Sequence, residues 1–192
     1  IVKRLLLERL TEPIHLNFLS ILIYFFGSFK LKVFYDCIIR QHNAYGILKS
    51  AELARSLGLK KMTVVEFGVA SGAGLLNMSN IAKKVENVTG ISIHCVGFDS
   101  GEGLPEPEDV KDYPNAFQKG DYPMPVEQLK KKCAQNTSLV LGNVLDTVKP
   151  FIEKLSEDEP IGYIVCDLDY YSSTISSFDI LKSNPNKYLP TI

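Results

Sequence analysis

The sequence predicts an α/β fold in which a parallel sheet carries helices on both of its faces. Between residues 61 and 192, short apolar runs alternate with longer amphipathic stretches. Consecutive runs are separated by enough chain for a helical crossover, and such crossovers join parallel strands. At 192 residues the chain is long enough for one domain with a full core and too short for two ordinary ones.

Four apolar runs are expected to be strands. The first covers residues 62–67 (MTVVEF), and a continuous run of this kind is typical of a strand buried on both faces. The other three are residues 91–99, 138–141 and 162–167. Helices are expected over residues 75–88, 126–135 and 144–155, because apolar side chains recur there at helical spacing. A last helix is expected near Ser172 and Ser173, which are candidate N-caps.

Residues 1–60 are expected to form an N-terminal helical segment, a cap or dimerisation element, in front of a core over residues 61–192. Within this segment, residues 16–29 are markedly apolar. A membrane span needs about 20 apolar residues, and this run is shorter. We therefore expect no membrane span, and a helix that is buried against the core or in a homodimer interface.

The charge balance and the cysteines limit the possible functions. The 21 basic and 22 acidic side chains leave a net charge of −1, whereas nucleic-acid binding relies on excess Lys and Arg, so no nucleic-acid partner is expected. The four cysteines (Cys37, Cys95, Cys133 and Cys166) show no close spacing. Buried free thiols in a reducing compartment, and thus a cytoplasmic location, explain them best.

A glycine-rich turn follows the first predicted strand and carries Glu66, Gly68, Gly72 and Gly74. Ligands of parallel α/β sheets bind at the carboxyl ends of the strands, where glycines let the backbone approach them closely. No Lys follows these glycines, which argues against a nucleoside triphosphate. A dinucleotide motif fits poorly, because Asn77 stands where a small residue should pack. An NAD(P)-dependent oxidoreductase and a merely tightly packed turn both stay open as alternatives.

The spacing ExGxxxGxG resembles the first motif of class I S-adenosylmethionine-dependent methyltransferases. Further segments, above all FDSGEGLP (98–105) and DLDYYSST (167–174), resemble the macrocin-O-methyltransferase-like group. The resemblance extends from about residue 35 to the end. It implies a Rossmann-like methyltransferase fold, S-adenosylmethionine as cofactor, and O-methylation of a hydroxyl on a sugar or another small natural-product molecule. Such sheets have more strands than the four counted here, so we expect the sheet to be truncated at its C-terminal end.

Three residues join the glycine turn as candidate cofactor ligands. Asp99 ends the second strand, where its carboxylate could accept hydrogen bonds from both ribose hydroxyls of an adenosine. Ser100 follows it in the same motif. Asn143 follows the third strand, at the position that faces the adenine in the resembled enzymes. The alternative roles are a solvated acid at a strand end for Asp99 and an ordinary turn residue for Asn143.

Asp167 and Asp169, at the end of the fourth strand, are the candidate catalytic and metal-binding residues. If the strand continues through them, its period of two places both carboxylates on one face. Hard carboxylates suit Mg²⁺, which takes one or two of them and keeps several waters. The resemblance implies that Asp167 is a magnesium ligand and the catalytic base. Alternatively, the two acids hold the following turn and favour the next helix through its dipole.

The sequence between Ser100 and Pro125 is a long loop with five prolines. Loops of this length in compact domains are often functional lids or mobile segments. The resembled group draws further metal ligands from a strand that would begin after residue 192. A catalytically silent cofactor-binding protein therefore stays open as an alternative to an enzyme.

Overall fold

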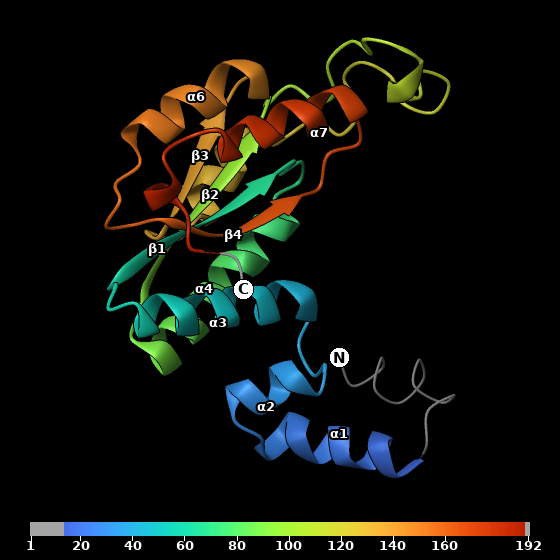
Figure 1. Ribbon diagram of the computed structural model, residues 1–192. Helices are drawn as coiled ribbons and strands as arrows, with labels where there is room; N and C mark the ends of the chain where they lie inside the picture. The colour runs from blue at the N-terminus through green and yellow to red at the C-terminus, as the bar shows by residue number, and fades with distance from the viewer. Residues whose placement is uncertain (1–13, 191–192) are drawn as a thin grey trace.

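A computed structural model describes residues 14–190, which contain a four-stranded, all-parallel sheet with the order β3-β2-β1-β4 (Figure 1). The strands are β1 (Lys61–Phe67), β2 (Ser92–Asp99), β3 (Thr137–Leu141) and β4 (Ile161–Cys166). These bounds agree with the four predicted runs to within one residue. The chain passes outward from β1 through β2 to β3 and then crosses to the other side of β1. The order in which strands are added therefore reverses between β1 and β4, although all four strands run parallel.

Helices cover both faces of the sheet, as predicted (Figure 1). On one face lie α3 (Gln41–Ser56), α4 (Ala73–Thr89) and the short α5 (Val126–Lys132). On the other lie α6 (Val144–Lys154) and α7 (Tyr171–Ser177), followed by the 3₁₀ turns η3 (Phe178–Leu181) and η4 (Pro185–Lys187). A further 3₁₀ turn, η2 (Val110–Asp112), lies in the long loop between β2 and α5.

The alternation of side chains along β1 divides the core into two layers. Met62 and Val64 belong to the cluster beneath α3 and α4, whereas Val65 and Phe67 belong to the cluster beneath α6. All four are fully buried. Because successive side chains of a strand point to opposite faces, a strand between two helical layers must be apolar on both faces. This explains why residues 62–67 form an almost unbroken apolar run.

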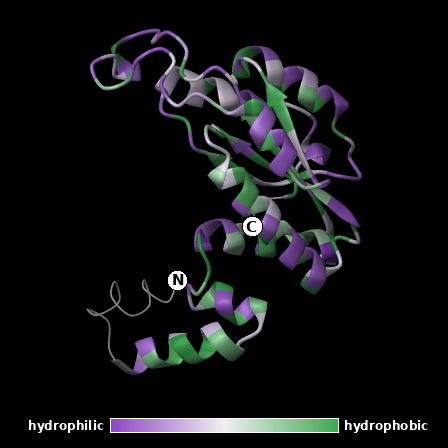
Figure 2. Cartoon of the chain, turned by 180° about the vertical axis from the view of Figure 1, so that it is seen from behind, coloured by the Kyte–Doolittle hydropathy of each residue, from purple (hydrophilic) through white to green (hydrophobic). Residues whose placement is uncertain are grey.

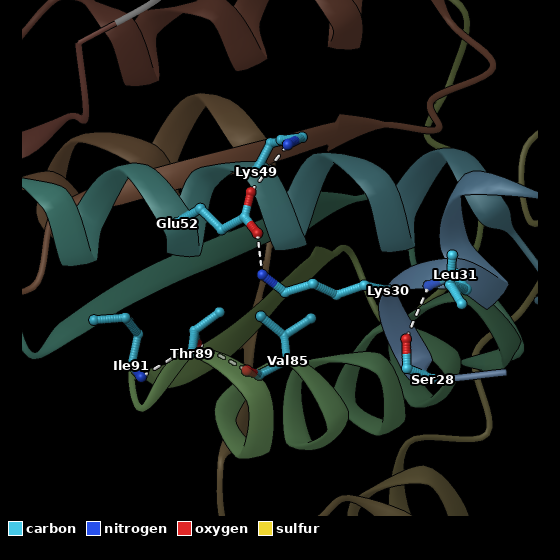
Figure 3. A network of polar contacts seen from close by, with 8 residues as sticks. All are labelled: Ser28, Lys30, Leu31, Lys49, Glu52, Val85, Thr89 and Ile91. Atoms are coloured by element: carbon cyan, nitrogen blue, oxygen red, sulfur yellow. Dashed lines mark hydrogen bonds and ion pairs between the residues drawn. The ribbon is translucent and has the colours of Figure 1, made fainter.

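Helices α1 (Ile14–Phe26) and α2 (Phe29–Phe34) precede the α/β core. A charged network fixes α2 to α3, because Glu52 of α3 accepts hydrogen bonds from both Lys30 and Lys49 (Figure 3). These bonds, of which the one from Lys30 has the larger effect, lower the pKa of the Glu52 carboxyl.

In the same view, the Thr89 hydroxyl donates to the Val85 carbonyl at the end of α4. The predicted helical segment also includes residues 1–13, which lie outside the described part.

Of the two alternatives expected for residues 16–29, burial against the core does not hold for one face of α1, and the alternative of a dimer interface stays a prediction. Phe18, Leu22, Phe25 and Phe26 are 64%, 43%, 60% and 85% exposed. Their spacing places them on one face of the helix. Figure 2 shows α1 largely in the colour of hydrophobic residues, below the α/β core. Within residues 14–190, no helix is long and apolar enough to cross a membrane.

The expectation of buried thiols holds for two of the four cysteines. All four cysteines are free, and Cys37 and Cys95 are buried. Cys133 is half-buried, and Cys166 is exposed at the end of β4. β4 is an edge strand in the order given above, and among residues 14–190 its outer side is bridged only at Ile161, by Tyr188, at the opposite end from Cys166.

Candidate functional site

A cavity of about 520 Å³ lies at the carboxyl ends of the strands. All four strands reach it: β1 through Phe67, β2 through Asp99, β3 through the Gly142–Asn143 turn and β4 through Asp167. Since the strands are parallel, their carboxyl ends meet at one edge of the sheet. The cavity therefore occupies the position at which ligands bind in open α/β sheets, beside the point where the strand order reverses.

Gly68 is the one of the three candidate glycines that lines this cavity. Its φ of +83° is a conformation that side chains disfavour. A Cβ on Gly68 would also lie 2.1 Å from the Asp167 carbonyl oxygen. Gly68 thus lets the turn after β1 pass directly against the turn after β4.

Gly72 and Gly74 serve packing instead. Gly72, with a φ of +85°, precedes the first turn of α4, and a Cβ there would lie 2.3 Å from the Leu129 side chain of α5. A Cβ on Gly74 would lie 2.1 Å from Oε1 of Glu66. Both glycines let α4 approach its neighbours closely, and neither is part of the cavity wall.

Glu66 lies behind the glycine turn rather than in the cavity wall. Its side chain is 1% exposed, and neither carboxylate oxygen has a hydrogen-bond partner among the described residues. Burial raises its pKa from 4.5 to about 7, against an opposing effect of Arg40, while Asp167 and Asp99 raise it further. A carboxyl group of this kind is short of donors and easily protonated.

Asp99 lines the cavity, but its carboxylate already holds the surrounding backbone. Oδ2 accepts hydrogen bonds from the N–H groups of Val69 and Ala70 at 2.9 Å each, and Oδ1 accepts one from Gly101 at 2.8 Å. An ionised carboxylate offers about four acceptor positions. Asp99 therefore orders the glycine turn and has room for one further donor. Binding of both ribose hydroxyls, as expected from the sequence, would require some of these bonds to be exchanged.

Ser100 and Asn143 also line the cavity and stabilise turns. The Ser100 hydroxyl donates to the Gly103 carbonyl at 2.6 Å and accepts from the Glu102 N–H. Asn143 is the N-cap of α6, where its side-chain oxygen accepts from the Leu145 N–H at 3.0 Å. The amide nitrogen of Asn143 is not used by this cap, so it can still donate to a ligand.

Asp167 and Asp169 both line the cavity, although β4 ends one residue before Asp167. The turn after the strand, rather than the period of two, places both acids there. Partial burial, and next the charge of Asp167, raise the pKa of the Asp169 carboxyl. The N-cap residue of the following helix is Tyr170, so neither acid occupies the N-cap position. The expectation that Ser172 or Ser173 caps it is wrong, since both lie in its first turn.

The wall of the cavity is strongly acidic. Among its described residues six are acidic and one, Lys119, is basic; the acids are Asp99, Glu102, Glu106, Asp121, Asp167 and Asp169. Three of these acids, together with Tyr122 and Lys119, come from the long loop and were not singled out from the sequence. Irregular loops lack the periodicity that reveals other elements. Such a wall favours a ligand that carries positive charge.

Among the described residues, only two carboxylates in the cavity are candidates to bind a metal ion. No group of three or more His, Cys, Asp or Glu side chains within residues 14–190 is placed to hold a metal. The two carboxylates of Asp167 and Asp169 are the candidate donors in the cavity. They match the small number of protein ligands that Mg²⁺ accepts when it keeps most of its waters, but not a closed cage.

Comparisons with known proteins support the fold. The sequence matches no family model and no curated protein. The crystal structure of CalS11, a calicheamicin methyltransferase, is similar to this chain with a TM-score of 0.55 and 23% sequence identity. The match covers 94% of this chain and 71% of that chain. The chain thus has the Rossmann-like methyltransferase fold, as the sequence predicts.

Proposed function

We propose that this chain is an S-adenosylmethionine-dependent methyltransferase that acts on a hydroxyl of a sugar or another small natural-product molecule. The observation that carries the proposal is the cavity in which the glycine turn, Asp99, Asn143 and Asp167 meet at the carboxyl ends of the strands. The shared fold with a calicheamicin methyltransferase supports it.

The chemistry of the cavity suits this cofactor. S-adenosylmethionine carries a positively charged sulfonium, which the acidic wall favours. Glu66 would support the cofactor only indirectly, because its buried side chain packs against Gly74 behind the glycine turn. The six acids of the described wall, against the one cation Lys119, are unfavourable for the negatively charged pyrophosphate of a dinucleotide.

Asp167 is the proposed base. The cofactor supplies an activated methyl group, so the protein must orient the acceptor hydroxyl and remove its proton. As the acceptor oxygen bonds to the methyl carbon and the carbon–sulfur bond breaks, the hydroxyl proton would pass to the Asp167 carboxylate. Holding the two reactants in line can contribute about 7–11 kcal/mol to lowering the barrier. With Asp169, Asp167 would also hold a Mg²⁺ ion that stabilises the developing alkoxide.

The Asp167→Asn variant tests this proposal in an assay that follows labelled methyl groups from S-adenosylmethionine to a panel of methyl glycosides and polyols. The substitution keeps the shape but removes the charge, so transfer should fall by at least about 100-fold, while affinity for S-adenosylhomocysteine changes little. EDTA should cause a similar loss, reversed by Mg²⁺. The matched control is Asp158→Asn, an exposed acid just before β4, at the opposite end of that strand.

Each contrary result removes a defined part of the proposal. Transfer that is indifferent to EDTA contradicts the metal role, and full activity of Asp167→Asn contradicts the base. If the protein binds S-adenosylhomocysteine but transfers nothing to any acceptor, a silent cofactor-binding protein becomes the better account.

The exposed face of α1 supports a second proposal, a homodimer. The five exposed side chains on this face, which include Leu19, are uncharged and apolar. Burying what they expose would remove roughly 500 Å² per protomer, and thus about 1,000 Å² for a symmetric pair. That is the lower bound for a specific interface.

The cysteines support a proposal about location. All four are free, and free thiols are typical of a reducing compartment such as the cytoplasm.

A further inference from the structure

The long loop between β2 and α5 forms one wall of the cavity and is fastened to α7. Its two ends pair through backbone hydrogen bonds, from the Leu104 N–H to Asp121 and from the Gly120 N–H to Leu104, at 2.8 Å each. Residues on both sides of this pairing line the cavity. Between them, residues 105–119 extend beyond α7, in yellow-green in Figure 1.

Asp112 fastens the far part of the loop. Oδ1 accepts a hydrogen bond from the Ser172 N–H at 2.9 Å, and Oδ2 accepts one from the Ser172 hydroxyl at 2.8 Å. The Glu108 N–H adds a bond within the loop at 2.9 Å. Asp112 is 1% exposed, whereas Asp109 is exposed, and among the described residues its carboxylate accepts a bond from the nearby Lys111 N–H and none from α7.

The carboxylate of Asp112 provides a cap that α7 otherwise lacks. Tyr170, the N-cap residue, makes no side-chain capping bond. Burial alone would raise the pKa of Asp112, but the hydrogen bonds from Ser172 and Glu108 outweigh it and leave the pKa lowered. The group is therefore ionised at neutral pH, and its bonds to the first turn of α7 are charge-assisted.

Three weaker contacts join the loop to the start of α7. The Tyr170 hydroxyl donates to the Pro105 carbonyl at 3.3 Å, and the Tyr170 ring lies edge-to-face with Phe117. The Lys111 ammonium lies 4.9 Å from the centre of the Tyr171 ring. The loop thus contacts three consecutive residues, 170–172, directly after the turn that carries Asp167 and Asp169.

We propose that Asp112 is a latch: its bonds to Ser172 hold residues 105–119 closed beside the cavity, and they must break for a ligand to enter or leave. The inference rests on the proposed function only for the identity of that ligand, S-adenosylmethionine or S-adenosylhomocysteine. Asp112 is a positioning residue in this account, because it acts on the loop and on α7 rather than on the ligand itself.

Limited trypsin digestion of the ligand-free protein tests the latch without reference to any cofactor. Lys111 and Lys119 are exposed cleavage sites within the latched loop. Asp112→Asn should raise the rate of cleavage after these residues at least tenfold, because the freed loop opens more often. Ser172→Ala removes one of the two bonds and should have a smaller effect in the same direction. Cleavage after Lys83 and Lys84 within α4 reports global unfolding and should not change.

The matched control is Asp109→Asn, the same substitution three positions earlier, in an acid that makes no bond to α7. It should leave cleavage at the wild-type rate. Equal rates for the wild type, Asp112→Asn and Ser172→Ala would overturn the latch. So would acceleration by Asp109→Asn that matches the effect of Asp112→Asn.

Stopped-flow release of S-adenosylhomocysteine tests whether the latch controls the cavity. Release from Asp112→Asn should be at least tenfold faster than from the wild type and Asp109→Asn. The dissociation constant should change less, because entry is faster too. Faster cleavage with unchanged release would overturn the gating role. Failure of the wild type to bind S-adenosylhomocysteine would instead contradict the proposed function, and the trypsin comparison would still decide on the latch.

Discussion

Glu66 is an acid in a nearly water-free setting, and its charge state should make the stability of the protein depend on pH. Its pKa in the folded protein, about 7, lies above the ordinary value of 4.5. The folded state therefore holds a proton that the unfolded state releases. The stability contributed by the neutral acid is complete below pH 4.5 and is lost as the pH rises through 7.

We predict that Glu66→Gln removes this dependence, because Gln keeps the shape of the neutral acid and cannot ionise. Between pH 4.5 and 8 the wild type should lose roughly 3 kcal/mol in free energy of unfolding relative to the variant. Urea unfolding at several pH values measures this difference, with Glu153→Gln on the exposed side of α6 as control. Parallel stability curves for the wild type and Glu66→Gln would contradict the shifted pKa.

Individual site residues could be predicted where their position follows from a strand end. Asp99, Asn143 and Asp167 line the cavity because each lies at a strand end or within two residues of one, and parallel strands end at one edge. The hydrogen-bond partners of these residues could not be predicted. Nothing in the sequence shows that the Asp99 carboxylate is occupied by the N–H groups of Val69, Ala70 and Gly101.

For Glu66, the direction of the side chain could not be predicted from the sequence. It was chosen because it leads the glycine motif, yet it lies on β1, where alternate side chains point to opposite faces. Its carboxylate points toward Gly74 and the layer of α3 and α4 instead of into the cavity. Which residues of a strand reach a ligand depends on the packing of the neighbouring helices, and that packing is tertiary information.

Elements were predictable where an apolar pattern has one consistent period. The strands and the helices α4 and α6 match the expected ranges closely, because burial fixes their patterns. The start of α7 was not predictable, since its cap comes from Asp112, 60 residues earlier in the chain. For α1 the sequence leaves two alternatives open for a related reason: an apolar helix face indicates burial, but it does not show whether the covering surface belongs to the same chain.

The exposed face of α1 leads to a prediction about assembly. We expect the protein to be a dimer by light scattering at micromolar concentration, and Phe25→Glu to convert it to a monomer, because a charge would then be buried in an apolar interface. Leu57→Glu, which places the same charge on another exposed apolar residue, at the end of α3, is the control. A wild-type monomer that stays in solution only with detergent would contradict the dimer and indicate a lipid-facing helix.

At the scale of the whole molecule, the strand order creates the site. The first crossovers place β2 and β3 on one side of β1, and the last places β4 on the other, which leaves the cavity beside the reversal. Alternating strands and helices predicted a parallel sheet but not this order. Local patterns do not encode which strands become neighbours, and the attachment of the long loop to α7 likewise joins segments far apart in the sequence.

The central claim is that this cavity binds S-adenosylmethionine. Hydrogen exchange of the protein with saturating S-adenosylhomocysteine, and separately with NAD⁺, tests it most directly, because the method reports both binding and place. We predict protection by S-adenosylhomocysteine in the three turns that line the cavity, around Gly68, Asp99 and Asn143, and none by NAD⁺. Protection by NAD⁺ without a response to S-adenosylhomocysteine would contradict the claim. Protection confined to the hollow near Leu57 and Pro185, at the opposite end of the sheet, would contradict it equally.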